Sequence, residues 1–399
     1  MGARAQQADA SLKGSVRLGS YLRRLRSGYG YSLRRVEERA RAEGGEIDNS
    51  QLSRYEKGIC YPSFDKLRVL ANVFNVSIQS FSDIVDLEEF EALKPATGAP
   101  RALVDEGVEA MKAGDNGRAF ALFERAIELL LDEEESPATE EILGLARINQ
   151  SAALIRLGKL ALAEQELRAA LRLSQRLDPT LQARALLALA STHADQGDYF
   201  LSEIEADRAY HIALDHSLTR LAAKAVGAQA RVLLDTGQSA AALDRYREAA
   251  RLHSECGDTY EGLRTKIMTG ACYTALGKSR EGMRVLRETL TEARAAGHRR
   301  LEALAWTNLG EAYYRAGDHP RARGCFRESD GLAMQASAKH PDLLFINAYY
   351  EWRMAAAETN PTREKIAFGR LKALRSSLER RFPEAEAFDD YVEKGHGHA

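Results

Sequence analysis

Turns that contain glycine recur along most of this 399-residue chain at a nearly constant interval, and this repeat restricts the possible folds more than any other feature. Successive turns are 44, 39, 40, 40 and 40 residues apart, and each lies between two helical runs rich in Ala and Leu. The turns are Gly114-Asp115, Gly158-Lys159, Gly197-Asp198, Gly237-Gln238, Gly277-Lys278 and Gly317-Asp318. A pair of helices cannot bury its apolar side alone, so a period of this length predicts a solenoid in which neighbouring pairs stack.

The composition predicts an all-α protein. The chain has nine Pro and is rich in helix formers, and residues typical of strands are scarce. Cys60, Cys256, Cys272 and Cys325 lie far apart without a CxxC pair, which indicates neither a disulfide framework nor a zinc site. No stretch approaches the roughly 18 consecutive apolar residues of a membrane span. We therefore expect a cytoplasmic protein without a metal, a cofactor or a membrane partner.

The net charge of −2 hides an uneven distribution of charged residues. Residues 13–75 contain thirteen Lys or Arg and seven Asp or Glu, whereas the residues after position 75 carry a net charge of −8. A basic start on an acidic body is expected when one end of a protein contacts phosphates and the rest does not.

Residues 16–85 alternate short amphipathic runs with turn signals, in a rhythm of five small helices. Leu18, Leu22 and Leu25 share one side of the first helix at helical spacing. Asp48 and Gln51 approximate a capping box that opens the third helix. The pattern predicts a five-helix domain ahead of the repeats.

This domain resembles the phage-repressor helix-turn-helix family (XRE-like, lambda/Cro type). The resemblance is carried by the run from Leu52 to Gly58, by Pro62-Ser63, and by Leu67, Ala71 and Phe74 at the core spacing of the family. Between Val36 and Leu52 the chain has about five more residues than the family pattern. Either the second helix is longer by a turn, or the connection to the third helix bulges.

The resemblance implies that the third helix lies in the major groove of DNA, with its first residues facing base edges. The positions that would read bases are Asn49, Ser50, Gln51, Ser53 and Arg54. Asn and Gln can bond adenine and Arg can bond guanine, so this set is chemically competent for readout. The alternative is that Asn49 and Ser50 only cap a helix and that Arg54 is a solvated charge.

Two further sets of residues follow from the same resemblance. Those expected to contact phosphates are Arg23, Arg24, Ser32, Arg34 and Lys57. As isolated residues, the charged members would be ordinary solvated side chains. Arg26 and Glu56 are expected to form a partly buried ion pair that braces the third helix.

The sixth repeat unit, AWTNLGEAYYRAGDHPRARGCF, resembles the tetratricopeptide (TPR) repeat. The matching residues are Trp306, Leu309, Gly310, Tyr313, Gly317, Ala322 and Phe326. Small residues such as Gly310 and Ala322 let two helices pack closely. The period near 40 exceeds the 34 residues usual in this family, which implies longer helices. A degenerate seventh unit, residues 341–392, would cap the array.

Polar residues at groove-facing positions of the repeats suggest a second binding site. They are Asn149, Arg184, Lys224, Arg231, Arg264, Asn308, Glu311 and Tyr314. A spaced row of cations and amides could hold the carboxylates and backbone of an extended peptide, as TPR grooves in similar proteins do. The alternative is a solvated helix face, because Arg is abundant throughout the chain.

These patterns divide the chain into five parts. We expect a flexible N-terminus (residues 1–15), a helix-turn-helix domain (16–86), a linker (87–100) that its prolines and glycine make slack, a TPR-like array of about seven hairpins (101–392) and a flexible C-terminus (393–399). His396 and His398 in that last part make a poor metal site.

The layout resembles the peptide-sensing TPR regulators of Gram-positive bacteria. This resemblance implies a DNA-binding transcriptional regulator, not an enzyme, that forms a homodimer through its array and binds a peptide or protein ligand in the groove. The alternative is a protein-interaction adaptor whose helix-turn-helix domain does not read DNA. An enzyme hidden in the array would need a convergent polar pocket, which the sequence does not display.

Overall fold

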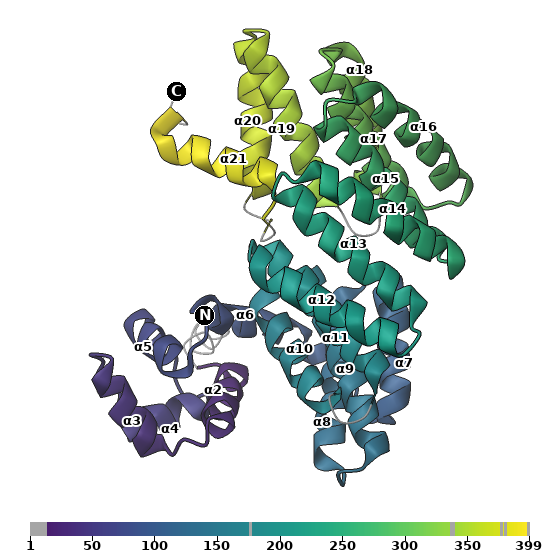
Figure 1. Cartoon of the computed structure of the whole chain (residues 1–399). Helices are drawn as coiled ribbons and strands as arrows, with labels where there is room; N and C mark the ends of the chain where they lie inside the picture. Colours follow the sequence, from purple (N-terminus) through teal and green to yellow (C-terminus); the bar gives the residue numbers. More distant parts are fainter. Residues whose placement is uncertain (1–13, 175–177, 336–339, 376–377, 379–380, 397–399) are drawn as a thin grey trace, which may run out of the picture.

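The computed structural model describes residues 14–174, 178–335, 340–375, 378 and 381–396, and all regular structure among them is helical (Figure 1). The all-α prediction is therefore confirmed. The expected N-terminal domain, here called the head, contains five α-helices as predicted. They are α2 (Val16–Gly28), α3 (Leu33–Ala42), α4 (Asn49–Glu56), α5 (Phe64–Phe74) and α6 (Gln79–Asp86).

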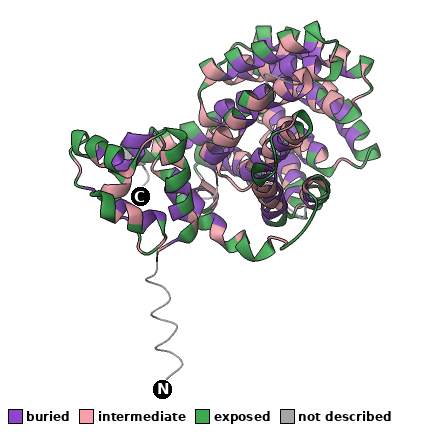
Figure 2. Cartoon of the chain, turned by 90° about the horizontal axis from the view of Figure 1, so that it is seen from below, coloured by how far each residue is buried: buried purple, intermediate pink, exposed green. Residues whose placement is uncertain are grey.

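The head helices enclose a small apolar core, to which Leu22, Val36 and Leu70 contribute fully buried side chains. In Figure 2 the buried residues of the head face inward and its outer surface is exposed. Gly14 and Ser15, expected in a flexible end, pack on this core. The Gly14 N–H donates to the Ile59 carbonyl oxygen at 3.4 Å, and Ser15 caps α2. Residues 1–13 and 397–399 lie outside the described part of the chain.

The connection between α3 and α4 holds the residues that exceed the family pattern. α3 ends at Ala42, and residues 43–48 lead to α4. Ile47 is buried in the head core, and a Cβ on Gly45 would stand 2.5 Å from a Val69 methyl group. The connection is therefore packed on the core, and it bulges instead of adding a helical turn.

Among the residues that the structure describes, seven helical hairpins follow the head and form the array, in agreement with the expected number. Their helices are α7 (Pro100–Lys112), α8 (Asn116–Asp132), α9 (Pro137–Arg156), α10 (Leu160–Ser174), α11 (Pro179–Gln196), α12 (Tyr199–Asp215), α13 (Thr219–Asp235), α14 (Ser239–Glu255), α15 (Thr259–Ala275), α16 (Ser279–Ala295), α17 (Arg299–Arg315), α18 (His319–Gln335), α19 (Pro341–Ala357) and α20 (Pro361–Arg375). A further helix, α21 (Pro383–Tyr391), and a π-helical turn, η2 (Val392–His396), end the described chain. The first helices of the hairpins are α7, α9, α11, α13, α15, α17 and α19.

Each of the six turn glycines lies between the two helices of a hairpin and has a left-handed backbone, with φ between 74° and 84°. A residue with a Cβ is strained in this conformation, which explains why glycine marks the period. None of the described helices is long and apolar enough to span a membrane.

Close packing inside a hairpin depends on small residues of the first helix. A Cβ on Gly310 would stand 2.4 Å from a ring carbon of Phe326, which is fully buried. Gly107 meets Phe123 in the same way, at 2.5 Å. The small residue predicted from the sixth repeat therefore makes room for an aromatic ring of the second helix.

Gly310→Ala should destabilise the array by about 1–3 kcal/mol, because the buried Phe326 ring has no space to move away from an added methyl group. Gly331→Ala is the matched control, since Gly331 is an exposed residue inside α18 with no atom within 4 Å of its Cβ position. The control should be neutral or stabilising by up to about 1 kcal/mol. Thermal unfolding of both variants measures the difference, and equal effects would contradict the packing argument.

The expected linker is not slack over most of its length. Leu87–Leu93 form a 3-10 helix, η1, whose Phe90 ring packs edge-on against Phe120 of α8 at 6.2 Å. Lys94 Nζ lies 2.9 Å from a Glu124 oxygen and 2.8 Å from a Glu128 oxygen. Pro95 and Gly98 lie in the stretch without helix between η1 and α7, and Pro100 begins α7. Phe90 and Lys94, however, hold this connection against the first hairpin.

The head itself docks on the first two hairpins of the array (Figure 1). Lys159, which precedes α10, places its Nζ 3.1 Å from Asp83 Oδ1 and 2.7 Å from Asp86 Oδ2 of α6. Tyr21 of α2 and Gln165 of α10 exchange hydrogen bonds at about 3 Å. The Arg17 guanidinium of α2 also donates to Glu124 of α8, so ion pairs and hydrogen bonds fix the head against both α8 and α10.

Candidate nucleic-acid interface and repeat groove

The residues expected to read bases lie together on α4, whose inner side is held by buried Leu52 and Tyr55. Asn49, Ser50 and Arg54 are exposed, and Gln51 and Ser53 are half-buried. The short helix therefore presents an amide, a hydroxyl and a guanidinium on one surface that the array does not cover.

The start of α4 is capped by Asp48 and not by the residues that follow it. Asp48 Oδ1 accepts the Gln51 N–H at 2.8 Å, and this hydrogen bond, with one from the Ser50 hydroxyl, lowers the pKa of Asp48. Asn49 and Ser50 are therefore the first two residues of α4 and not its cap. The Gln51 side chain does not complete a capping box, because its Oε1 accepts a hydrogen bond from Lys66 Nζ at 2.8 Å.

Lys66 is a site residue that sequence reasoning missed. It lies on α5, fifteen positions from Gln51 in the chain, so no helical spacing connects the two residues. Its hydrogen bond fixes the Gln51 amide and leaves the amide NH2 group available as a donor.

Arg26 and Glu56 form the expected ion pair between α2 and the end of α4. Arg26 Nε lies 2.6 Å from Glu56 Oε1, and Nη2 lies 2.9 Å from Oε2. The Glu56 side chain is only 4% exposed, and its hydrogen bond raises the pKa of Arg26. The guanidinium also donates to the Tyr31 carbonyl oxygen at 3.0 Å. The pair fixes the position of α4 in the head.

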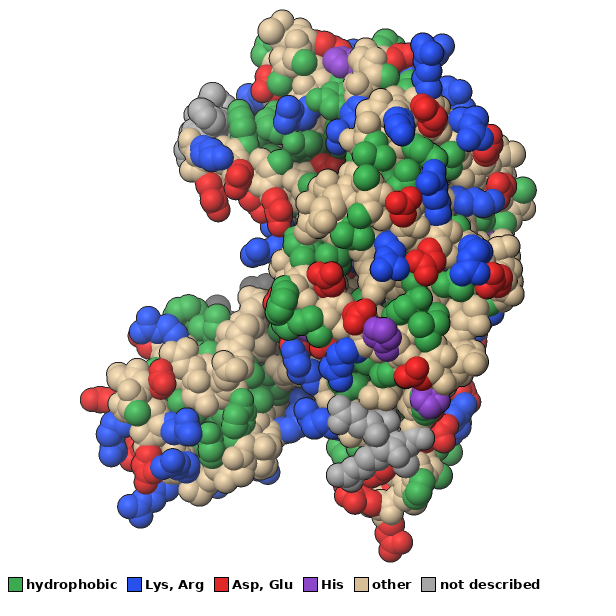
Figure 3. All heavy atoms as spheres, in the orientation of Figure 1, with side chains coloured by type: hydrophobic (Ala, Val, Ile, Leu, Met, Phe, Trp, Pro, Cys, Tyr) green, Lys and Arg blue, Asp and Glu red, His purple; other side chains and the backbone are tan. Residues whose placement is uncertain are grey.

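All five residues expected to contact phosphates are exposed on the head: Arg23, Arg24, Ser32, Arg34 and Lys57. Ser32 also caps α3, where its hydroxyl accepts the Arg35 N–H at 3.1 Å. Lys and Arg side chains stand along the outer edge of the head in Figure 3.

Arg24 has contacts within the head and lies next to the array. Its guanidinium lies over the Tyr21 ring, 5.5 Å from the ring centre, and its side chain lines a small cavity with Gln165 and Glu166 of the array. Arg24 therefore lies at the junction of the head and the array, and its phosphate contact stays a prediction.

All eight expected groove residues lie on first helices of the hairpins, from α9 to α17. Several of them join neighbouring first helices. Arg184 of α11 lies 3.5 Å from Asn149 of α9, and the ring of Tyr314 lies 5.1 Å from that of Tyr350 on α19. The Asn308 amide instead bonds the Leu304 carbonyl oxygen of its own helix at 2.9 Å.

The cations of this groove do not form an open row, which corrects the sequence-based picture. Arg264 Nε lies 2.6 Å from Glu261, and Lys224 Nζ lies 4.0 Å from the same carboxylate. Arg231 pairs with Asp195 at 2.6 Å and Asp235 at 3.3 Å. Burial would lower the pKa of Arg231, but the two carboxylates outweigh it and raise the pKa. Arg231 thus clamps α13 to α11.

The residues Arg381–Val392, here called the C-terminal segment, return to the first helices. The Arg381 N–H donates to the Asp195 carbonyl oxygen of α11 at 2.8 Å. The Tyr350 hydroxyl of α19 donates to Glu384 Oε1 at 3.0 Å. Apolar residues at helical spacing could have indicated α21 in the sequence, but no local signal shows that it reaches α11, which lies far away in the chain.

Glu384 combines burial with nearby like charges. Burial, then the carboxylates of Glu311 and Asp235, raise the pKa of Glu384 to about 7 from 4.5. The protonated form is therefore the one that the docked segment favours. This contribution to docking is complete below pH 4.5 and is lost as the pH rises through about 7.

We expect amide exchange in α21 to become faster between pH 5 and pH 8, after correction for the intrinsic exchange rate. Glu384→Gln should remove most of this dependence, because the amide cannot ionise. Glu386→Gln, an exposed position of the same helix, should leave it unchanged. Hydrogen exchange measured by mass spectrometry tests this. An equal pH dependence in wild type and Glu384→Gln would show that another group titrates.

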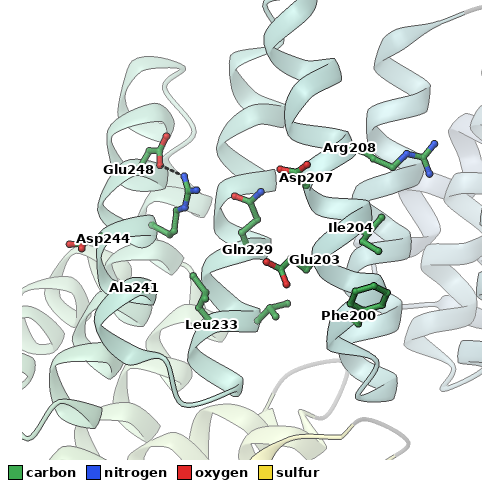
Figure 4. A pocket seen from close by; sticks show the side chains of 12 residues that line it. Phe200, Glu203, Ile204, Asp207, Arg208, Gln229, Leu233, Ala241, Asp244 and Glu248 are labelled. Atoms are coloured by element: carbon green, nitrogen blue, oxygen red, sulfur yellow. Dashed lines mark hydrogen bonds and ion pairs between the residues drawn. The ribbon is translucent and has the colours of Figure 1, made fainter.

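A hollow of about 810 Å³ between α12, α13 and α14, here called the outer hollow, was not foreseen from the sequence (Figure 4). Phe200 and Ile204 line it and are 73% and 39% exposed. The charged side chains around them are Glu203, Asp207, Arg208, Asp244, Arg245 and Glu248. The surface thus combines apolar side chains with an acidic rim.

Comparison with known proteins agrees with this two-part architecture. Residues 17–80 match the model of a helix-turn-helix domain family, and residues 275–337 match a tetratricopeptide repeat model. No curated protein matches the chain significantly.

Three solved structures show similar folds. The Rap conjugation gene regulator of the plasmid pLS20, in complex with the Phr* peptide, is 15% identical, with a TM-score of 0.54 over 90% of this chain and 96% of that chain. The apo form of RapI is 10% identical, with a TM-score of 0.54 over 74% and 99%. A Rap protein complexed with Competence and Sporulation Factor is 16% identical, with a TM-score of 0.53 over 74% and 79%. The chain thus carries a helix-turn-helix domain followed by an array of tetratricopeptide-type repeats.

Proposed function

We propose that the protein is a sequence-specific DNA-binding transcriptional regulator. The carrying observation is the exposed surface of α4, where Asn49, Ser50 and Arg54 stand on a helix whose position is fixed by the Arg26–Glu56 pair. Amides and guanidinium groups at the start of such a helix can bond adenine and guanine in the major groove. The net positive charge of residues 13–75 supplies phosphate attraction.

The array is proposed to bind a peptide and to hold two copies of the chain together. The similar Rap conjugation gene regulator supports the first part, because its structure is a complex with the Phr* peptide, and the similar Rap protein is a complex with Competence and Sporulation Factor. A single helix-turn-helix domain reads only a half-site. A cytoplasmic homodimer that spans two half-sites roughly 34 Å apart would provide tight binding.

Docking of the head supplies the physical connection between these two activities. Because α6 is bonded to Lys159 and α2 to Gln165, a change in the stacking of the first two hairpins moves the head with it. A ligand then shifts DNA affinity only to the extent that it prefers one arrangement over the other.

Lys159→Glu should release the head from the array. The substitution places a third carboxylate beside Asp83 and Asp86, and Asp83 is only 2% exposed at its side chain. We expect amide exchange in α6 to accelerate about tenfold. Lys112→Glu is the control, because Lys112 is 67% exposed and pairs only within α7 among the described residues. Unchanged exchange in α6 would mean that the ion pairs do not hold the head.

The salt dependence of DNA binding separates this proposal from the adaptor alternative, which the outer hollow favours because its exposed Phe200 suits a protein partner. A DNA reader that neutralises several phosphates should lose affinity steeply as salt rises from 50 to 200 mM, with a linear log–log slope. An adaptor should be indifferent to duplex DNA at every salt concentration. Fluorescence anisotropy with a labelled duplex distinguishes the two.

A further inference from the structure

First helices of four hairpins converge on the beginning of the C-terminal segment. α11 contributes the Asp195 carbonyl oxygen that accepts from Arg381, and α19 contributes the Tyr350 hydroxyl that bonds Glu384. The carboxylates of Asp235 on α13 and Glu311 on α17 are near enough to raise the pKa of Glu384. In Figure 1, α21 starts beside α13 and α19. The segment therefore lies along the side of the array on which the expected groove residues stand.

Glu311 and Tyr314, two of those groove residues, belong to the surroundings of the segment. Glu311 acts on the Glu384 carboxyl group, and Tyr314 packs on Tyr350, which holds Glu384. A peptide that lay along the first helices would have to pass the same place. The segment and such a peptide cannot both occupy it.

The contacts of the segment have the character of peptide recognition. Phe382 is buried, with its ring edge-on to that of Phe345 at 5.7 Å, and Phe388 is buried against Trp352 and Phe368. A carboxyl group two residues after Phe382 accepts a hydrogen bond, and the backbone of Arg381 donates one. Aromatic anchors, one carboxyl group and a main-chain hydrogen bond are what a groove uses to hold a short peptide.

Electrostatic repulsion between carboxylates also opposes the docking of the C-terminal segment. Glu384 bonds Tyr350 of α19, and the carboxylates of Glu311 on α17 and Asp235 on α13 act on it, whereas Arg315 of α17 acts on the Tyr350 hydroxyl and pairs with Glu311. Like charges in a buried place weaken the docking when all are ionised.

We propose that the C-terminal segment is a built-in occupant of the groove, which a peptide ligand with aromatic and carboxyl groups must displace. This inference rests on the proposed peptide-binding function. Because the segment competes for the site, the apparent affinity for a ligand is the intrinsic affinity multiplied by the fraction of molecules whose groove is open. Displacement also breaks the hydrogen bond to α11. This helix belongs to the hairpin that follows the one containing α10, on which the head is docked. Displacement of the segment therefore changes contacts in the hairpin next to the docked head.

A disulfide can test the proposal, because a Cβ on Gly197 would lie 4.0 Å from the Cβ of Arg381. This separation suits a disulfide bond. The double variant Gly197→Cys/Arg381→Cys therefore locks the segment in place when oxidised and frees it when reduced. Each single variant controls for the substitution itself, including the strain of Cys at the left-handed Gly197.

The probe is a fluorescein-labelled peptide with the sequence of residues 381–392, RFPEAEAFDDYV, and a scrambled version is its control. Anisotropy should show binding to the reduced double variant and at least tenfold weaker binding to the oxidised one. A second full-length variant, Phe382→Ala, should bind the probe at least threefold more tightly than wild type. Glu386→Ala, at an exposed position, should match wild type.

Equal binding by the oxidised and reduced forms would overturn the proposal. So would a folded Phe382→Ala variant, verified by circular dichroism, that binds the probe no better than wild type. DNA binding measured on the same preparations keeps the two claims apart. If DNA binding is retained and the disulfide has no effect on probe binding, the regulator proposal stands and the C-terminal segment is not an occupant of the groove. If the disulfide blocks the probe but no DNA is bound, the segment is an occupant and the regulator proposal is wrong.

Discussion

Replacing Glu56 with alanine should leave the head marginally stable or unfolded while the array stays folded. The substitution leaves the Arg26 guanidinium, 19% exposed, without the carboxylate that accepts two of its hydrogen bonds. Removing one partner of a buried ion pair destabilises a protein by about 3–5 kcal/mol. A small domain has a total stability of about 5–15 kcal/mol, so the head would become marginal or unfolded.

The control for this prediction is Glu38→Ala. Glu38 also pairs with arginines, Arg34 and Arg35, but its side chain is 48% exposed, so the loss should stay below about 1 kcal/mol. Urea denaturation followed by hydrogen exchange reports on the head and the array separately. If Glu56→Ala and Glu38→Ala behaved alike, the Arg26–Glu56 pair would not be what fixes α4.

Gln51→Ala and Arg54→Ala should each relax base recognition at one position of the DNA site. A good side chain–base pair contributes about 1–3 kcal/mol of discrimination, which corresponds to roughly 5- to 150-fold. Arg54 is exposed and free to reach a base, whereas Gln51 is oriented by Lys66, so the Gln51 effect should shrink when Lys66 is replaced by Met.

The matched control is Arg101→Ala, an arginine 57% exposed on α7 of the array, which should not change DNA binding. Competition binding with single-base variants of the DNA site measures the outcome. A uniform loss of affinity across all sequences would mean that Arg54 contacts phosphates and does not read bases.

Local signals in the sequence predicted the elements of this fold well. The turn glycines marked the hairpins because each needs a left-handed backbone, and Gly310 marked close packing because Phe326 fills the space beside it. The Arg26–Glu56 pair followed from resemblance to a family, and the structure contains it.

Long-range contacts are what the sequence could not predict. The sequence does not show whether Arg231 is exposed or paired with two aspartates. Arg231 meets Asp195 only because α11 stacks on α13. Lys94 was expected to lie in slack chain, because its partners Glu124 and Glu128 are thirty or more positions away. The return of Arg381 to α11 depends on the course of the whole array, which no local pattern encodes.

Selection from a random duplex library with the full-length protein at low salt tests the central claim most directly. We expect one motif to be enriched, with two related half-sites whose centres are roughly 34 Å, or one helical turn, apart. If no sequence were enriched at any salt concentration, the surface of α4 would not read DNA, and the account of this protein as a sequence-specific regulator would be wrong.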